Sequence, residues 1–269
     1  MSKIGFIGAG NMAEAIIKGI IDARTYRPED ILIADVRKDR LDELTEKYNI
    51  SFTTNTKLAK AVDILVLSIK PQNMIAVLSE IKGSVTGDTL IVSIAAGITT
   101  ETIRKTLGFD SVIRVMPNTP ALIGQGTTVL YATPAAKDRL GEAEHIFLAV
   151  GYVTSVADEK LLDAVTAVSG SGPAYFFLLM EEMIKTATKL GLDKELAERT
   201  VLVTARGAAL LAIERAKAGE KVDVLRQQVT SPNGTTEAAL KVFAKHNFEK
   251  IINEALTAAE KRSKELSGS

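Results

Sequence analysis

The opening fifteen residues constrain the fold of this chain more than any other stretch. An apolar run over residues 4–7 leads into Gly8-Ala9-Gly10, and apolar residues then recur at helical spacing. This order predicts a strand, a tight turn and a helix. Gly8 suits the turn, Gly10 leaves room for a ligand near the main chain, and Ala13 allows close packing of helix on strand. Free amides at the helix start favour a pyrophosphate, although such a turn can also bind nothing.

Apolar runs alternate with helical segments as far as residue 156. We expect further strands at residues 31–34, 51–54, 62–69, 89–94, 111–116, 129–131 and 152–154. The continuously apolar run at 62–69 is typical of a parallel strand that is covered on both faces. We therefore predict an α/β protein whose N-terminal domain, residues 1–156, is a Rossmann-like, doubly wound parallel sheet.

Four of the predicted strands end in small, polar or proline residues that suit the lining of a ligand site. These ends are residues 8–11, Asp35, residues 69–72 and residues 95–97. Ligands of doubly wound sheets lie beyond the carboxyl ends of the strands. The convergence of four such ends favours dinucleotide binding over a purely structural turn.

The residues after the second strand leave the choice between NAD and NADP open. Asp35 stands 22 residues after Ala13, where a carboxylate accepts hydrogen bonds from a ribose 2′-hydroxyl and repels a 2′-phosphate. Arg37, Lys38 and Arg40 follow at once. They could pair with the 2′-phosphate of NADP or form an ordinary solvated helix start.

Composition excludes several classes of protein. The 33 basic and 33 acidic residues cancel, so no basic field indicates nucleic acid or acidic lipid as a partner. The chain has no cysteine, and His145 and His246 stand far apart, so we expect neither a thiol nucleophile nor a metal site. No run reaches the roughly 18 apolar residues of a membrane span, and no signal-peptide pattern is present. We expect no membrane association and a cytoplasmic location.

The strand signals stop at about Ala157, and residues 157–269 predict a helical domain. We expect helices over residues 161–168, from Pro173 to about 190, and from a cap at Asp193 to about 218. The last of these is apolar around much of its circumference, which requires enclosure. We therefore predict a homodimer formed mainly by an all-helical C-terminal dimerisation domain.

A polar, turn-rich loop at residues 229–237 leads into another predicted helix, which starts near Thr235. Several hydroxyls and free amides at a helix N-terminus make a small anion pocket that suits a substrate carboxylate. Ordinary helix capping by Thr235 or Thr236 is the alternative, and capping would use only one hydroxyl.

Six motifs, taken in order, resemble those of the pyrroline-5-carboxylate reductase family, which catalyses the last step of proline biosynthesis. They are GAGNM at 8–12, VLSIKPQ at 66–72, SIAAG at 93–97, RVMPNTP at 114–120, SGSGPAY at 169–175 and TSPNGTT at 230–236. The resemblance covers essentially the whole chain. It implies a dinucleotide-binding domain, a helical dimerisation domain, and dimers that often gather into larger rings.

The resemblance also implies roles for individual residues. The pyrophosphate would bind Gly8, Ala9, Gly10, Asn11 and Met12. The adenine-side ribose would contact Asn55, beside Asp35 and Arg37. The nicotinamide half would contact Ile69, Lys70, Pro71, Ala95, Ala96 and Gly97. The substrate carboxylate would bind Ser231, Gly234, Thr235 and Thr236.

Two positions depart from the family pattern. Asn233 stands where the family usually has glycine, but asparagine tolerates left-handed backbone angles better than most residues. Asp35 stands where many relatives that use NADPH have a small or neutral residue. The second departure concerns the preference for NADPH or NADH and does not concern the reaction.

The implied reaction is hydride transfer from NADPH or NADH to the C=N bond of 1-pyrroline-5-carboxylate, which gives L-proline. A protonated imine is already electrophilic, so the main work of the protein is to position the substrate carboxylate and ring. Thr236 is the first candidate for a hydrogen bond to the imine nitrogen, and Ser171 or a water is the second.

Two other functions compete with this interpretation. A β-hydroxyacid dehydrogenase shares the domain plan but uses a catalytic lysine on the interdomain helix, and here Lys185 and Lys189 lie outside that motif. The other alternative is a dinucleotide sensor or scaffold without catalytic activity. Nicotinamide absorbance in the presence of pyrroline-5-carboxylate, followed with NADH and with NADPH, distinguishes all three.

Overall fold

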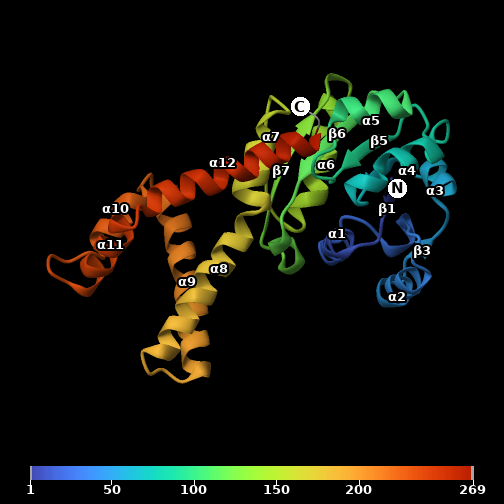
Figure 1. Cartoon of the computed structure of the whole chain (residues 1–269). Helices are drawn as coiled ribbons and strands as arrows, with labels where there is room; N and C mark the ends of the chain where they lie inside the picture. The colour runs from blue at the N-terminus through green and yellow to red at the C-terminus, as the bar shows by residue number, and fades with distance from the viewer. Residues whose placement is uncertain (1, 268–269) are drawn as a thin grey trace. The chain divides into compact units, whose positions relative to one another are not determined.

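The computed structural model describes residues 2–267, which form two compact units (Figure 1). The sheet unit comprises the chain up to Pro173 together with the segment from Ala258, and the helical unit is Ala174–Thr257. Helix α12 (Phe248–Ser267) therefore begins in the helical unit and ends in the sheet unit. The domain boundary predicted at residue 156 stays a prediction from the sequence.

An eight-stranded sheet in the order β3-β2-β1-β4-β5-β6-β7-β8 is the basis of the sheet unit. The strands are β1 (Ile4–Ile7), β2 (Ile31–Ala34), β3 (Ser51–Phe52), β4 (Ile64–Leu67), β5 (Leu90–Ser93), β6 (Val112–Met116), β7 (Gly126–Ala132) and β8 (Gly151–Ser155). The predicted α/β fold is confirmed, and a strand lies at each predicted position.

The expectation of a parallel sheet fails at one edge. Strands β1 to β6 are parallel to one another, but β7 is antiparallel to β6, and β8 is parallel to β7. The connection from β6 to β7 contains only the short 3-10 helix η3 (Thr119–Ile123). A parallel return needs a longer crossover, so this short connection turns the chain back.

Helices cover both faces of the sheet and bury its central strands from two sides (Figure 1). The α-helices of the sheet unit before α8 are α1 (Asn11–Asp22), α2 (Lys38–Tyr48), α3 (Asn55–Ala61), α4 (Met74–Ile81), α5 (Thr100–Leu107), α6 (Leu140–Leu148) and α7 (Leu161–Val165). Alternate strand residues serve different cores: Ile4 and Phe6 pack with α1 and α6, whereas Ile7 packs with α3, α4 and α5. This two-sided burial explains why the strands are continuously apolar.

Four parallel strands end in register along one edge of the sheet. Their last residues, Ala34, Ile7, Leu67 and Ser93, are aligned partners on β2, β1, β4 and β5, and Arg114 in the middle of β6 is aligned with Ser93. The strand order reverses between β1 and β4. Such a switch point is where doubly wound sheets bind their ligands, and it lies directly after Ile7, at the glycine turn.

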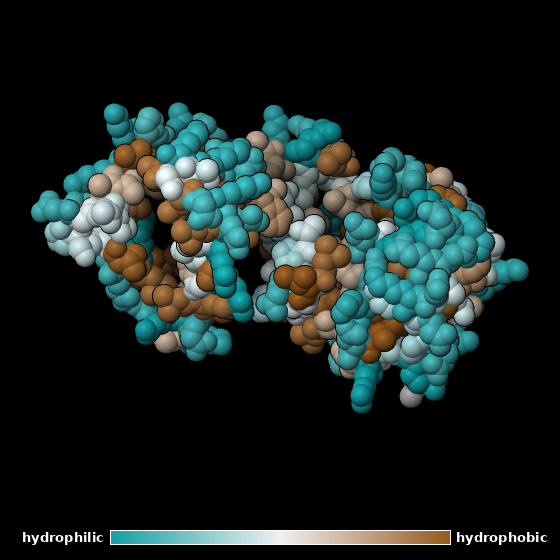
Figure 2. All heavy atoms as spheres, turned by 90° about the horizontal axis from the view of Figure 1, so that it is seen from below, coloured by the Kyte–Doolittle hydropathy of each residue, from teal (hydrophilic) through white to brown (hydrophobic). Residues whose placement is uncertain are grey.

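The helical unit contains most of α8 (Gly172–Lys189), then α9 (Lys194–Lys217), α10 (Val222–Gln228), α11 (Thr235–Lys245) and the first half of α12. The predicted cap at Asp193 is confirmed, because its side chain accepts a hydrogen bond of 3.0 Å from the Leu196 amide. Of the described residues 174–257, only Ala197 and Val201 are buried. Large apolar side chains instead lie open on the surface, as the brown atoms in Figure 2 show.

The helix predicted over residues 161–168 has a different ending. Helix α7 stops at Val165 and continues as a π-helical turn, η5 (Thr166–Gly170), before α8 begins.

No helix among residues 2–267 is long and apolar enough to cross a membrane.

Candidate functional site

The glycine turn after β1 is held between the ends of β2 and β4. Gly8 has a φ of +96°, and a Cβ there would lie 2.6 Å from the Ser68 carbonyl oxygen, so only glycine fits. The Gly8 amide donates to the Ala34 carbonyl at 2.8 Å, and the Ser68 hydroxyl donates to the Gly8 carbonyl at 2.6 Å. The predicted turn is therefore present and rigid.

The peptide groups of Ala9 are fixed on both sides of the residue. The Ala9 amide donates to Asp35 Oδ2 at 2.8 Å, and Arg40 Nε donates to the Ala9 carbonyl at 2.8 Å. Arg40 is buried and also pairs with Glu14 and Glu43. Three basic residues were considered as partners of a 2′-phosphate. Of these, Arg40 instead binds the glycine turn.

The N-terminus of α1 is open to an anion. A Cβ on Gly10 would meet no heavy atom within 4 Å, and α1 begins at Asn11 without a side-chain cap. The first amides of a helix lack intrahelical acceptors and carry the positive end of its dipole. The geometry fits a pyrophosphate that approaches the main chain closely.

A cleft of about 440 Å³ opens beside this turn at the switch point. It brings together seven of the predicted cofactor residues, namely Gly8, Gly10, Asp35, Arg37, Asn55, Ile69 and Lys70. The side-chain amide of Asn55, the first residue of α3, donates to Glu80 at 2.8 Å. The other predicted cofactor residues are not among its lining: Ala9, Asn11, Met12, Pro71, Ala95, Ala96 and Gly97.

Opposite charges stand side by side in the cleft. Asp35 Oδ1 accepts a hydrogen bond of 2.9 Å from the Arg37 amide and lies 3.4 Å from Arg37 Nε. Burial raises the pKa of Asp35, but the amides of Ala9 and Arg37 and the Arg37 guanidinium outweigh it and lower the pKa below its usual range. Asp35 is therefore ionised, while Arg37 and Lys70 supply cations that suit phosphate groups.

The loop after β5 lies against the end of the chain. Gly97 has a φ of +71°, and a Cβ there would lie 2.9 Å from the Leu266 Cβ of α12. The Ala95 amide donates to the Ser93 hydroxyl at 3.4 Å. Leu266 therefore lies beside the loop predicted to bind the nicotinamide. The sequence motifs did not indicate this neighbour.

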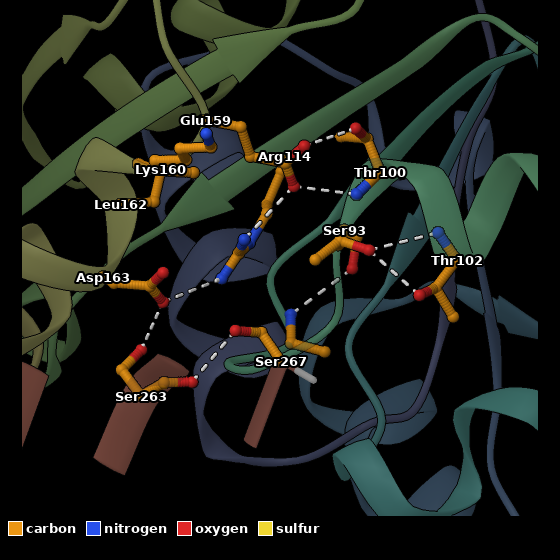
Figure 3. Close-up of polar contacts among 12 residues, drawn as sticks. Ser93, Thr100, Thr102, Arg114, Glu159, Lys160, Leu162, Asp163, Ser263 and Ser267 are labelled. Carbon is orange, nitrogen blue, oxygen red and sulfur yellow. Dashed lines mark hydrogen bonds and ion pairs between the residues drawn. The ribbon is translucent and has the colours of Figure 1, made fainter. Parts of the chain in front are cut away.

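A buried polar cluster around Arg114 was also missed from the sequence (Figure 3). The Arg114 side chain, only 4% exposed, pairs with Glu159 at 3.1 Å and lies 3.9 Å from Asp163 Oδ1. The Ser263 hydroxyl donates to the same Asp163 oxygen at 2.6 Å. A charged residue inside the apolar run of β6 was a signal in the sequence, because a buried charge requires partners, and Arg114 also opens the motif RVMPNTP.

Ser171, the second candidate for the imine contact, follows the π-helical turn. Its amide donates to the Thr166 carbonyl at 2.8 Å. The turn is tied to the motif after β6, since Asn118 Nδ2 donates to the Ser169 carbonyl at 3.2 Å. Single π turns are frequent at functional sites, and the role of Ser171 stays a prediction.

The loop before α11 keeps its hydroxyls free. Gly234 is the N-cap residue of α11, and no side chain caps the helix. Capping by Thr235 or Thr236 is therefore not observed. Within residues 2–267, the hydroxyls of Ser231, Thr235 and Thr236 have no hydrogen-bond partner. Asn233 adopts a φ of +60°, the left-handed conformation that its glycine-like role requires.

Comparison with known proteins decides the family. Residues 159–266 match the model described as pyrroline-5-carboxylate reductase dimerisation, and residues 3–97 match NADP oxidoreductase coenzyme F420-dependent. The pyrroline-5-carboxylate reductase of Pseudomonas aeruginosa is 43% identical over 267 residues, which cover 98% of this chain and 96% of that protein. The chain belongs to the pyrroline-5-carboxylate reductase family. The sequence-based resemblance is confirmed.

Solved structures of the pyrroline-5-carboxylate reductase family agree over the full length. The chain is similar to the Coxiella burnetii reductase with a TM-score of 0.90 and 44% identity, covering 99% of this chain and 98% of that one. It is similar to a Plasmodium falciparum pyrroline carboxylate reductase with NADP bound, at a TM-score of 0.88 and 30% identity, with 99% and 98% covered. The dimerisation match over the C-terminal helices supports the predicted homodimer.

No group of three or more histidine, cysteine, aspartate or glutamate residues gathers to hold a metal ion anywhere in the described part of the chain. The polar groups of the cleft, and separately those of the loop before α11, are amides, hydroxyls and single charges. Such groups bind and orient phosphates and carboxylates, which is the chemistry that a reductase of this family needs from its protein.

Proposed function

We propose that this chain reduces 1-pyrroline-5-carboxylate to L-proline with NADPH. Similarity to pyrroline-5-carboxylate reductases over 98% of the chain is the observation that carries the assignment. The glycine turn and its cleft at the switch point support it, because they form a dinucleotide site of the kind that this reaction uses.

The cleft residues fit a phosphorylated dinucleotide. The open amides of α1 suit the pyrophosphate, and Arg37 is the exposed cation next to Asp35, where a 2′-phosphate would need a partner. NADP is bound in the Plasmodium falciparum relative. When bound, NADPH supplies the hydride. The hydrogen bonds between Ala9 and the side chains of Asp35 and Arg40 keep the glycine turn in place for NADPH.

The loop at residues 231–236 holds the substrate carboxylate. Its unpaired hydroxyls and the first amides of α11 are the anion-binding groups of the helical unit. The Thr236 hydroxyl oxygen accepts a hydrogen bond from the N–H of the protonated imine and fixes the ring, with Ser171 as the second candidate. Positioning of this kind lowers the barrier without a protein acid or base of shifted pKa.

The homodimer forms through the C-terminal helices, and we propose that the dimers gather into a ring. The exposed apolar side chains of α8, α9, α11 and α12 are the surfaces available for both kinds of contact. A cytoplasmic location is part of the same proposal and follows from the predicted biosynthetic role.

The test is a stopped assay with the purified chain, pyrroline-5-carboxylate and either NADPH or NADH. We expect proline to form in step with oxidation of the reduced nicotinamide, faster with NADPH. Oxidation of a β-hydroxyacid by NADP with no reduction of pyrroline-5-carboxylate would indicate the dehydrogenase instead. Cofactor binding without turnover of either substrate would indicate a sensor.

A further inference from the structure

Arg114, in the middle of β6, is the centre of a buried polar cluster. It is aligned with Ser93 of β5, in the same row as the ends of β1 and β4. A guanidinium buried this completely is tolerated only with charged partners, which here are Glu159 and Asp163. Glu159 and Asp163 are therefore held by a buried residue of the sheet.

Glu159 links Arg114 to the segment that follows the loop predicted to bind the nicotinamide. Its carboxylate accepts hydrogen bonds from the Thr100 amide at 2.8 Å and from the Thr100 hydroxyl at 2.6 Å (Figure 3). Thr100 is the first residue of α5. The start of α5, three residues after the loop at residues 95–97, is thus tied to the residue that neutralises Arg114.

Asp163 links Arg114 to helix α12. It accepts a hydrogen bond from Ser263, a contact that joins residues 100 positions apart (Figure 3). Three residues later, Leu266 lies so close to Gly97 that an added Cβ would be 2.9 Å from the Leu266 Cβ and 3.2 Å from its carbonyl carbon. The last turns of α12 therefore form a wall against the loop.

On the basis of the proposed function, we infer that Arg114, Glu159 and Asp163 are positioning residues. They hold the loop at residues 95–97 for the nicotinamide end of the cofactor, with the last turns of α12 as its wall. None of the cluster residues lines the cleft that contains Asp35 and Arg37. The cluster consequently acts on one end of the cofactor only, whereas a merely structural cluster would affect both ends.

Binding measurements on the full chain separate these two effects. The ligands are NADPH and 2′-phospho-ADP-ribose, which lacks the nicotinamide. The variants are Ser263→Ala, which removes the bond to Asp163, and Leu266→Gly, which removes the Cβ that lies beside Gly97. Arg262→Ala is the matched control, because Arg262 pairs with Glu265 on α12 at an exposed position.

We expect both variants to raise the Kd for NADPH about fivefold to tenfold, the effect of losing one buried hydrogen bond or contact. The Kd for 2′-phospho-ADP-ribose should change less than about twofold, as should both values for Arg262→Ala. Leu266→Ala, which keeps the Cβ beside Gly97, should bind NADPH like the wild type. Thermal unfolding of each variant identifies any that fails to fold, and Leu266 lies outside the core.

An equal loss for both ligands would overturn the inference, and so would unchanged NADPH binding in Leu266→Gly. The proposed function fails differently. A wild-type chain that binds NADPH but does not reduce pyrroline-5-carboxylate would contradict the reaction and leave the comparison of the two ligands intact.

Discussion

Strand β4 is buried at all of its four positions, whereas helix α9 buries only Ala197 and Val201 among its 24 residues. Both segments are rich in apolar side chains, so composition does not explain the contrast. The strand lies between two layers of helices, while Leu210, Leu211 and Ile213 of the helix are about half exposed or more. The sheet unit completes its own core, and the helical unit does not.

The difference has energetic weight. Burial of one leucine, isoleucine or phenylalanine side chain contributes about 1.5–3 kcal/mol, so the open side chains of the helical unit represent a large stabilisation that only a partner surface can supply. The dimerisation match over residues 159–266 identifies the partner as a second copy of the chain. The four predictions below test this contrast, from the largest expected effect to the smallest.

Replacement of Leu210 and Ile213 by glutamate should break the dimer. Charges on an apolar face that is enclosed by a second copy cost several kcal/mol, about enough to abolish association at micromolar concentration. Sedimentation velocity should show monomers, with NADPH binding by the sheet unit retained. Lys217→Glu, at an exposed position on the same helix, should stay dimeric. A dimeric double variant, or a monomeric wild type, would contradict the contrast.

Glu14→Gln should weaken the sheet unit alone. Burial raises the pKa of Glu14, but hydrogen bonds from Lys47, Arg40 and Tyr48 lower it from 4.5 to about 2. The carboxylate therefore stabilises the fold above about pH 4.5, and this contribution of roughly 3 kcal/mol is lost as the pH falls towards 2. Urea unfolding of the variant should show a lower free energy near neutral pH and a flatter acid profile.

The matched control for that measurement is Glu101→Gln. Glu101 forms an exposed pair with Lys105, and such pairs contribute little to stability. If Glu101→Gln and Glu14→Gln had equal effects, the buried network around Arg40 would not be a feature that distinguishes the sheet unit.

Thr236→Ala tests what the helical unit contributes to chemistry. Loss of a hydrogen bond near the imine should raise the KM for pyrroline-5-carboxylate and lower kcat, with kcat/KM reduced about 30-fold. Steady-state kinetics measure both constants. Thr230→Val is the control, because the Thr230 hydroxyl already donates to the Arg226 carbonyl at 2.6 Å. Unchanged kinetics for Thr236→Ala would remove this residue from the site.

Arg37→Ala tests what the sheet unit contributes to cofactor choice. Loss of a guanidinium partner for the 2′-phosphate should raise the KM for NADPH about tenfold and leave the KM for NADH nearly unchanged. Lys38→Ala should alter neither value, since Lys38 pairs with Asp42 and does not line the cleft. Equal effects on both cofactors would show that Arg37 does not recognise the 2′-phosphate.

Local patterns predicted the parts of the fold that depend on neighbouring residues. The glycine turn needs only Gly8 and its flanking strand and helix, and the Asp193 cap needs only the next three residues. The reversal of β7 was not predicted, because strand direction depends on the length of a connection and not on the strand itself. The π-helical turn after Val165 likewise has no residue pattern that announces it.

The site divides in the same way. Asp35 and Arg37 were identified from their distance to the glycine turn, and both line the cleft. The Arg114 cluster was not identified, because Asp163 and Ser263 meet only after the chain has closed over 100 residues. Residues that hold others in place rarely belong to short motifs, since their partners are distant in sequence.

Helix α12 bears on how the chain is made. Ribosomal synthesis releases the N-terminal part first, and domains generally fold in that order. The sheet unit cannot follow it to completion, because the residue beside Gly97 is Leu266, which is synthesised after the whole helical unit. The loop at residues 95–97 thus acquires its wall only after residues 174–257 have been made.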